Sequence, residues 1–209
     1  MSNILDITFP LTPELTVWPG DTQTAVSTLK EVGKDARSMT SRLTMSSHAG
    51  THVDAPAHFI EDGKTVESLS LQVLMGKCRV VEVTDNDITA GVIDALNIPD
   101  GVERILFKTS NSKRFTGTEP FFKDYVGVTL CGAERLIDLG IKLIGLDYLS
   151  AAAYSDIEAV HQTLLGERVV LLETLDLRNV PTGDYRLICL PLRLPGVDGS
   201  PCRALLIQE

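Results

Sequence analysis

Cysteine is scarce in this sequence, and its distribution excludes two classes of small protein. Four cysteines are spread over 209 residues without a CxxC pair. A disulfide framework is therefore not expected, and neither is a closed, cysteine-rich structural zinc site. Cys78 and Cys189 lie in apolar runs, so we expect them to be buried free thiols.

A positive charge excess and long apolar runs are also missing. The formal net charge is −9, whereas nucleic acids and anionic membranes bind clustered Lys and Arg. No apolar run approaches the ~20 residues that span a bilayer. Residues 1–17 have no basic region followed by an apolar core, so they do not form a signal peptide. We expect a cytoplasmic protein that acts on a small molecule and binds neither nucleic acid nor membrane.

Length and composition indicate one folded domain over residues 1–209. A chain of this length can bury a substantial core, and its 44% hydrophobic and 22% charged residues are usual for a globular protein. No repeat, low-complexity tract or linker divides it. Short apolar and β-branched runs predict strands over 4–9, 25–30, 38–46, 78–84, 104–109, 142–145, 168–172, 186–190 and 203–208. Helices are predicted over 71–74, 88–96 and 131–139. A capping box at Ser155 predicts one more helix, which ends at residue 166. Residues 110–122 are predicted to form a long loop. The fold class is therefore mixed α/β and strand-rich.

Histidine is equally scarce, but three of the four histidines lie within twelve residues, at His48, His52 and His58. Asp54 belongs to the same stretch. Imidazole and carboxylate are ligands that zinc and similar divalent metals prefer, so the stretch predicts a metal site. Solvated strand histidines without a metal are the alternative. We consider it the weaker explanation, because it would have to account for three histidines and an aspartate together.

The spacing in this stretch favours an extended strand over a helix. Pro56 would interrupt a helix. In a strand, residues two apart share a face, so His48, His52 and Asp54 would point the same way. The pattern predicts a ligand-bearing strand that runs into a proline-bent loop carrying His58.

Further ligands are needed to complete a metal shell. His161, the remaining histidine, lies on a predicted helix, and Glu173 follows the apolar strand that comes after it. They are 12 residues apart, so a helix-to-strand return could bring them together. From the residues alone, Glu158 and Glu167 on the same segment remain rivals.

Several segments resemble one known family. The run from His48 to Phe59 resembles the HxGTHxDxPxHF signature of the cyclase family of metal-dependent hydrolases, which includes bacterial kynurenine formamidase and isatin hydrolase. Residues 18–21 (WPGD) resemble the N-terminal signature of the family. Residues 144–147 and 190–201 resemble parts of its C-terminal half, so the resemblance covers nearly the whole chain.

The resemblance implies a fold, a metal and a set of roles. The family fold is a swivelling β/β/α domain, usually dimeric or tetrameric, so we expect a homodimer or homotetramer. One or two zinc ions are implied, with manganese possible. His58 matches the residue assigned as acid/base. The implied metal ligands are His48, His52, Asp54, His161 and Glu173.

These roles predict an arylformamidase that cleaves N-formylkynurenine to kynurenine and formate. Bound zinc would lower the pKa of its water to about 7, and His58 would take the proton and return it to the leaving amine. Trp18 and Phe59 could stack on an aromatic substrate, although core packing explains both nearly as well. One alternative is a hydrolase of another cyclic amide or lactone, like isatin hydrolase. A second is a non-catalytic protein that binds carboxylates through its metal, which would not need His58.

Overall fold

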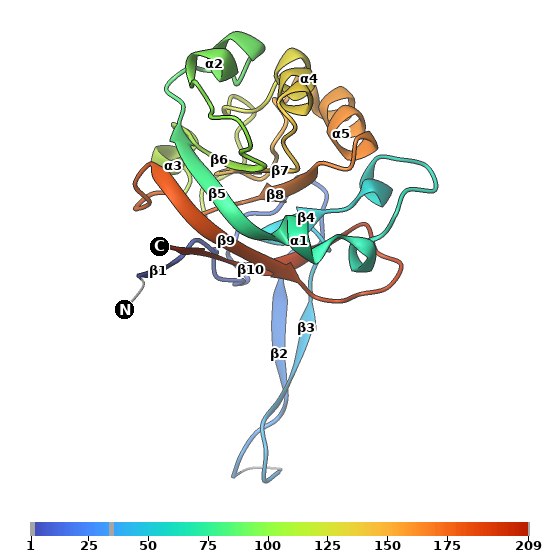
Figure 1. Cartoon of the computed structure of the whole chain (residues 1–209). Coiled ribbons are helices and arrows are strands. Elements are labelled where there is room, and N and C mark those ends of the chain that lie inside the picture. Colours follow the sequence, from blue (N-terminus) through green and yellow to red (C-terminus); the bar gives the residue numbers. More distant parts are fainter. Residues whose placement is uncertain (1–2, 34–35, 209) are drawn as a thin grey trace.

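The fold is built around an eight-stranded β-sheet that closes on itself, in a computed structural model that describes residues 3–33 and 36–208 (Figure 1). The strands are β1 (Ile4–Asp6), β2 (Ala25–Lys30), β3 (Thr40–Thr44), β4 (His52–Asp54), β5 (Met75–Glu82), β6 (Arg104–Lys108), β7 (Leu143–Leu146), β8 (Val170–Glu173), β9 (Gly183–Pro191) and β10 (Gly199–Ile207). The helices are α1 (Leu71–Leu74), α2 (Ala90–Ala95), α3 (Asn111–Arg114), α4 (Leu130–Asp138) and α5 (Ile157–Gly166), with 3-10 turns η1 (Pro56–His58) and η2 (Val66–Ser68). This is the mixed α/β, strand-rich class predicted from the sequence.

Strand pairing closes the large sheet into a barrel. Its order is β1-β10-β4-β8-β7-β6-β5-β9, and β9 also pairs with β10. Strands β5, β6, β7 and β8 run parallel, and the remaining pairs are antiparallel. Parallel neighbours need a crossover connection, and α2, α4 and α5 lie in these connections, together on one side of the sheet (Figure 1).

The two faces of the central strands pack into two different cores. In β6, Ile105 and Phe107 pack with the helices, whereas Leu106 belongs to the cluster inside the barrel. In β8, Leu171 packs with the helices and Leu172 lies inside the barrel. Strands that are buried on both faces are expected to be continuously apolar, which explains why these runs lack a polar alternation.

The hairpin of β2 and β3 projects from the body on the side away from the helices (Figure 1). Its strands pair antiparallel with each other, and every residue in them is exposed. The sequence predicted strands here, but not that both faces would be left uncovered. We refer to residues 25–44, of which 34–35 are not described, as the arm.

The predicted helices and strands occur at the expected places, with differences at their ends. Helix α5 ends as predicted, but the capping box at Ser155 is wrong: the N-cap is Asp156, and no side chain caps it. The short helix α3 lies within the segment predicted as a loop. Among the described residues, no helix is long and apolar enough to cross a bilayer.

Candidate metal centre

The register of β4 on β8 sets the position of three carboxylate and imidazole groups. His52 lies directly opposite Glu173, and Val53 lies opposite Leu172. Val53 and Leu172 face the barrel interior. Because side chains alternate along a strand, His52, Asp54 and Glu173 face the other side, beneath the helices.

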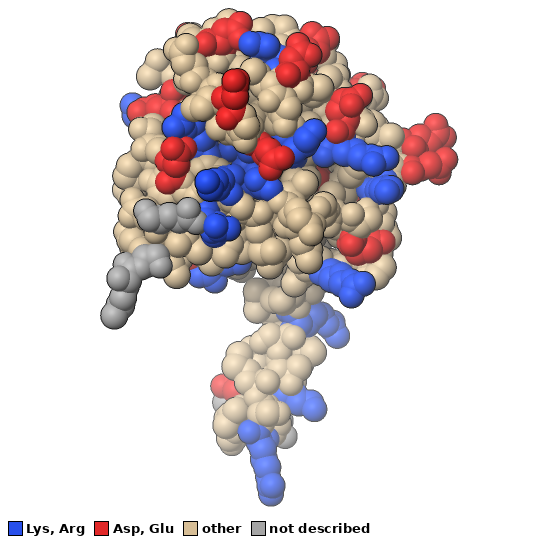
Figure 2. Space-filling model, in the orientation of Figure 1, with Lys and Arg blue, Asp and Glu red and all other residues tan. Residues whose placement is uncertain are grey.

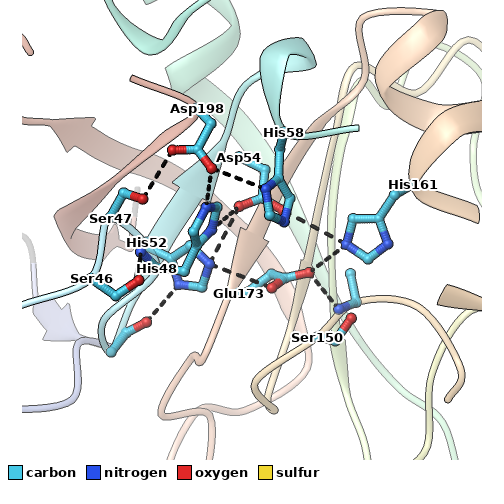
Figure 3. Close-up of polar contacts among 12 residues, drawn as sticks. Ser46, Ser47, His48, His52, Asp54, His58, Ser150, His161, Glu173 and Asp198 are labelled. Atoms are coloured by element: carbon cyan, nitrogen blue, oxygen red, sulfur yellow. Dashed lines mark hydrogen bonds and ion pairs between the residues drawn. The ribbon is translucent and has the colours of Figure 1, made fainter. Parts of the chain in front are cut away.

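The structure brings all six predicted ligand and acid/base residues together (Figure 3). Asp54 and Glu173 lie at the centre of the group. The four imidazoles come from four places: the turn before β4 (His48), β4 itself (His52), the η1 turn (His58) and helix α5 (His161). The adjoining cavity has a volume of about 190 Å³. Its lining residues are Trp18, Asp21, His48, His52, His58, Phe59, Leu149, Ser150, Ile157, His161 and Glu173.

The predicted ligand strand is shorter than expected. Strand β4 begins at His52, because Gly50 adopts a φ of +63° and turns the chain. A Cβ atom at this glycine would lie only 2.7 Å from Leu11 Cδ2. His48 therefore reaches the site from a turn, and the prediction that it shares an extended strand with His52 and Asp54 was wrong. Its ring is still held at the site, with Nδ1 2.9 Å from Asp54 Oδ1.

Two buried polar atoms at the centre lack a hydrogen-bond partner among the described residues, namely His52 Nε2 and Asp54 Oδ2. His52 Nδ1 donates to the carbonyl of Gly50 at 2.7 Å, so in the neutral ring, the form that binds a metal, the lone pair is on Nε2. Nε2 lies 3.3 Å from Asp54 Oδ1 and 3.5 Å from Glu173 Oε2. Two donors that each lie about 2.0–2.1 Å from one tetrahedral ion are separated by about 3.4 Å. The orphaned atoms and these separations fit a divalent metal.

A hydrogen bond from Nδ1 to a backbone carbonyl orients the ring of His161, as it does that of His52. Its Nδ1 donates to the backbone carbonyl of Ile157 one helical turn earlier, at 2.7 Å. Nε2 is thereby turned toward the centre, 3.5 Å from Glu173 Oε1 and 3.7 Å from Asp54 Oδ2. The hydrogen bond fixes the tautomer that a metal ligand requires.

The geometry separates Glu173 from its two rivals. Glu173 is buried, and its Oε1 also accepts a hydrogen bond from the backbone N–H of Ala151 at 2.7 Å. Glu158 and Glu167 are exposed on α5 and at its end. Only Glu173 of these three belongs to a group of donors close enough to share a metal.

Two such groups occur among the described residues, and they share one carboxylate. His52, Asp54 and Glu173 form one, and His48, Asp54 and His58 form the other, with the donor atoms of each group within 4.8 Å of one another. The shared Asp54 is compatible with either one ion or two. Because His58 belongs to the second group, its position fits a metal ligand as well as the predicted acid/base.

Charge interactions within the site raise the pKa of three imidazoles, those of His52, His48 and His161. Burial alone would lower the pKa of His52, but the neighbouring carboxylates of Asp54 and Glu173 raise it to about 9. His48 is partly buried, which alone would lower its pKa, but its contacts with Asp198 and Asp54 raise that pKa to about 10. In the metal-free protein at pH 7, the rings of His52 and His48 therefore hold protons that a metal must displace.

His58 is shifted in the opposite direction. Burial lowers the pKa of His58 below its ordinary value. Its ring is neutral at pH 7 and has one lone pair that can accept a proton. A neutral imidazole beside a metal centre is suited to general acid–base chemistry.

Asp198 is a site residue to which the sequence assigned no role. Its Oδ2 lies 2.8 Å from His48 Nε2 and 3.1 Å from His58 Nδ1, and Oδ1 accepts a hydrogen bond from Ser47 Oγ at 3.0 Å (Figure 3). The hydrogen bonds hold the pKa of this carboxyl below its ordinary value. The only signal was its place in the 190–201 segment that resembled the family.

Both predicted aromatic residues lie at the cavity and also touch the core. Phe59 stacks on the ring of His161, with centroids 4.4 Å apart and planes at 27°. Trp18 meets Phe121 edge to face at 4.9 Å. Phe59 and Trp18 are partly buried against the core on the helical side of the sheet. Their predicted contact with substrate stays a prediction.

Comparisons with known proteins identify the family to which this chain belongs. A family described as "Putative cyclase" matches residues 5–153. The chain is 42% identical to Cyclase-like protein 3 of Arabidopsis thaliana, over 98% of this chain and 79% of that protein. It is 39% identical to a kynurenine formamidase of Bacillus cytotoxicus, over 98% of this chain and 97% of the relative. A solved structure described as a potential metal-dependent hydrolase with cyclase activity has a TM-score of 0.85 and 31% identity, and the match covers 100% of this chain and 99% of that one.

Proposed function

Because the chain belongs to the cyclase family, we propose that it cleaves an arylformamide, with N-formylkynurenine as the first candidate substrate. It is a metal-dependent hydrolase that acts on C–N bonds other than peptide bonds. The observation that carries the proposal is the pair of orphaned donor atoms on His52 and Asp54, beside a neutral His58 and an aromatic cavity wall.

We propose zinc as the metal, with one or two ions per chain, and manganese as the next candidate. The ligands would be His48, His52, Asp54, His161 and Glu173. This set contains imidazole nitrogen and carboxylate oxygen without thiolate, a combination found in catalytic zinc sites. When bound, the metal supplies Lewis acidity, which polarises a carbonyl oxygen and lowers the pKa of water to about 7.

His58 is the residue that we propose to transfer the proton in the reaction. Its Nδ1–H donates to Asp198, which leaves Nε2 free to take a proton from the attacking water. The same nitrogen then gives that proton to the leaving aryl amine as the C–N bond breaks. Water is thereby added across the amide, and the products are the free amine and formate.

The test combines metal analysis with an assay. Protein purified without chelator is measured for metal content, and formate release from N-formylkynurenine is followed with and without added zinc or manganese. Metal-dependent formate release supports the proposal. Turnover of isatin, but not of the formamide, would replace it with cyclic amide hydrolysis. Bound metal without turnover of either would favour a non-catalytic carboxylate-binding protein.

We also propose that the protein works in the cytoplasm as a homodimer or homotetramer, with the arm as a contact between copies. A two-stranded ribbon is marginally stable in water on its own. The arm nevertheless carries five large apolar side chains that are each at least 49% exposed. They are Val26, Leu29, Val32, Met39 and Leu43. Exposed large apolar side chains that are concentrated on one segment indicate an interaction site.

Charge indicates a second copy as the partner of the arm. Lys and Arg predominate on it (Figure 2), and its described residues include Lys30, Arg37 and Arg42 against Glu31. The whole chain has a formal net charge of −9, so the remainder of the molecule is acidic. A basic arm and an acidic body are complementary between two identical chains.

A further inference from the structure

The cavity beside the metal centre has one charged wall residue that the metal centre does not use. Among the described residues that line it, the ionisable groups are four histidines, Glu173 and Asp21. The histidines and Glu173 belong to the metal and acid/base group. Asp21 stands apart from them, and nothing in the reaction proposed above gives it a role.

A tight turn places Asp21 beside the aromatic wall. The backbone N–H of Asp21 donates to the carbonyl of Trp18 at 2.9 Å, and Gly20 has a φ of +102°. The Pro19–Gly20 pair thus forms a type II turn, which requires a positive φ at its third residue. The turn brings the Trp18 ring and the Asp21 carboxylate to the same cavity.

The carboxylate of Asp21 is only partly satisfied. Its Oδ2 accepts a hydrogen bond from Ser46 Oγ at 3.2 Å, and this is the only hydrogen bond that its side chain receives from the described residues. No Lys, Arg or His in the described part of the chain forms an ion pair with it. A half-buried carboxylate without a cation is available to a positively charged ligand group.

The wall around Asp21 is largely apolar, and neighbouring rings pack against Trp18. Trp18 lies nearly parallel to Tyr154, with planes at 28° and centroids 6.3 Å apart, and it meets Phe121 edge to face. Leu149 and Ile157 add aliphatic surface to the cavity. Such a wall suits an aryl ring, and a few placed polar groups then decide which substituents are accepted.

We propose that Asp21 selects aryl substrates that carry an ammonium group, by binding that ammonium while the ring lies against Trp18. The proposal rests on the arylformamidase function and narrows its substrate class to arylformamides with an amine-bearing side chain. N-formylkynurenine belongs to this class through its α-amino group. The same carboxylate disfavours aryl substrates whose only charge is negative, because like charges repel.

If Asp21 had only a structural role, its loss would affect the kinetics of the substrates in a different way. Ser46 Oγ donates to Asp21, and it also accepts a hydrogen bond from the backbone N–H of His48 at 3.2 Å. Through this chain, loss of Asp21 could disturb the metal centre. Such a disturbance would slow every substrate alike, whereas loss of an ammonium contact affects only substrates that carry the ammonium.

The experiment compares two formamides that share one ring, with the metal-loaded protein. The neutral substrate is 2′-formamidoacetophenone, and the cationic one is N-formylkynurenamine, which adds an aminomethyl group to the acetyl carbon. The measured quantity is the ratio of kcat/KM for the cationic over the neutral compound. We expect a ratio of about ten or more in the wild type, and a loss of about tenfold or more of that ratio in Asp21→Asn. Ser46→Ala is the control that keeps the carboxylate, and it should keep the ratio.

Binding provides a readout that does not depend on turnover. Trp18 is the only tryptophan in the chain, so its fluorescence reports on ligands at this wall. Kynurenamine and 2-aminoacetophenone are titrated into the wild type and Asp21→Asn. We expect the substitution to raise the Kd of kynurenamine about tenfold more than that of 2-aminoacetophenone.

The outcomes separate this inference from the function on which it rests. A wild type without preference for the cationic ligand, or an equal loss for both ligands in Asp21→Asn, would overturn the role of Asp21. Turnover of the neutral formamide would leave the hydrolase intact in that case. If neither formamide is hydrolysed, the arylformamidase proposal fails, and the fluorescence titration still decides whether Asp21 binds an ammonium group.

Discussion

His58 donates through Nδ1 to Asp198 Oδ2 across 3.1 Å, although 140 residues separate the two in the chain. Because Asp198 is an ionised acceptor, the proton of the neutral ring stays on Nδ1 and the lone pair on Nε2. The pair therefore fixes which nitrogen of His58 can act as a base. His48 Nε2 contacts the same carboxylate oxygen of Asp198. Asp198 therefore links the orientation of the His58 ring to a proposed metal ligand.

His58→Ala should lower kcat by about 10²–10⁴-fold, because the proton acceptor is lost. Metal content should stay at the wild-type level, since the five proposed ligands remain. Both quantities are measured on one preparation, by elemental analysis and by formate release. Full activity would refute the acid/base role. Loss of metal together with activity would instead make His58 a ligand, as its place beside His48 and Asp54 allows.

Asp198→Asn should lower activity by about 10–100-fold, the range found for residues that orient groups at metal sites. The amide can present its NH₂ group to His58 Nδ1 and so favour the wrong tautomer. Ser47→Ala is the matched control, because it removes the other hydrogen bond to Asp198 and leaves both imidazole contacts in place. Steady-state kinetics of the two variants at equal metal content make the comparison. An Asp198→Asn enzyme as active as Ser47→Ala would exclude the orienting role.

Glu173→Ala should reduce the bound metal per chain, because a buried carboxylate at the centre of the donor group is removed. Glu167→Ala is the control: it removes a carboxylate from an exposed position nearby in the chain. Metal is counted after dialysis against the same metal buffer. Unchanged stoichiometry in Glu173→Ala would remove this residue from the shell.

Val26→Asp with Leu43→Asp should weaken association between copies. The two residues lie directly opposite each other in the arm and share one of its faces, so the change places two charges in a proposed apolar contact. Ser27→Asp puts a charge on the other face and serves as the control. Sedimentation velocity measures the populations of each species. A monomeric wild type would end the assembly proposal.

Among the four cysteines, Cys131 should react with iodoacetamide first in the native protein at pH 8. It is exposed, and a hydrogen bond with Thr129 lowers the pKa of its thiol, so more of the reactive thiolate is present. Burial raises the pKa of Cys202 to about 12 and raises those of Cys78 and Cys189 as well. Mass spectrometry should find one label, which Cys131→Ser removes, and four labels after denaturation. Rapid labelling of a buried thiol would show that the barrel opens locally.

The metal centre could be predicted largely because its chemistry is local in the chain. Three of the proposed ligands lie within seven residues, and their residue types alone indicate a divalent metal. His161 and Glu173 could be nominated because a helix and the following strand return to one place. Reasoning from the residues alone left Glu158 and Glu167 as rivals; the family resemblance favoured Glu173, and the register of β8 puts it opposite His52.

What the sequence could not provide depends on contacts that are distant in the chain or on single backbone angles. The role of Asp198 requires knowing that β10 lies beside β4. The turn that presents His48 depends on one positive φ at Gly50, which a strand pattern does not reveal. The exposure of both faces of the arm could not be predicted either. The alternation of side chains between the two faces of a strand does not indicate whether another element covers either face.

A nascent chain makes its histidine motif long before it makes the strand that flanks it. Asp54 pairs with Gly199, so β4 lacks this neighbour until roughly 145 further residues are synthesised, on the order of ten seconds at 5–20 residues per second. Throughout that interval the imidazoles are open to any divalent ion, and copper and nickel bind nitrogen ligands more tightly than manganese does. A metal that arrives before β8 is made therefore meets these imidazoles and Asp54 without the carboxylate that Glu173 adds in the folded site.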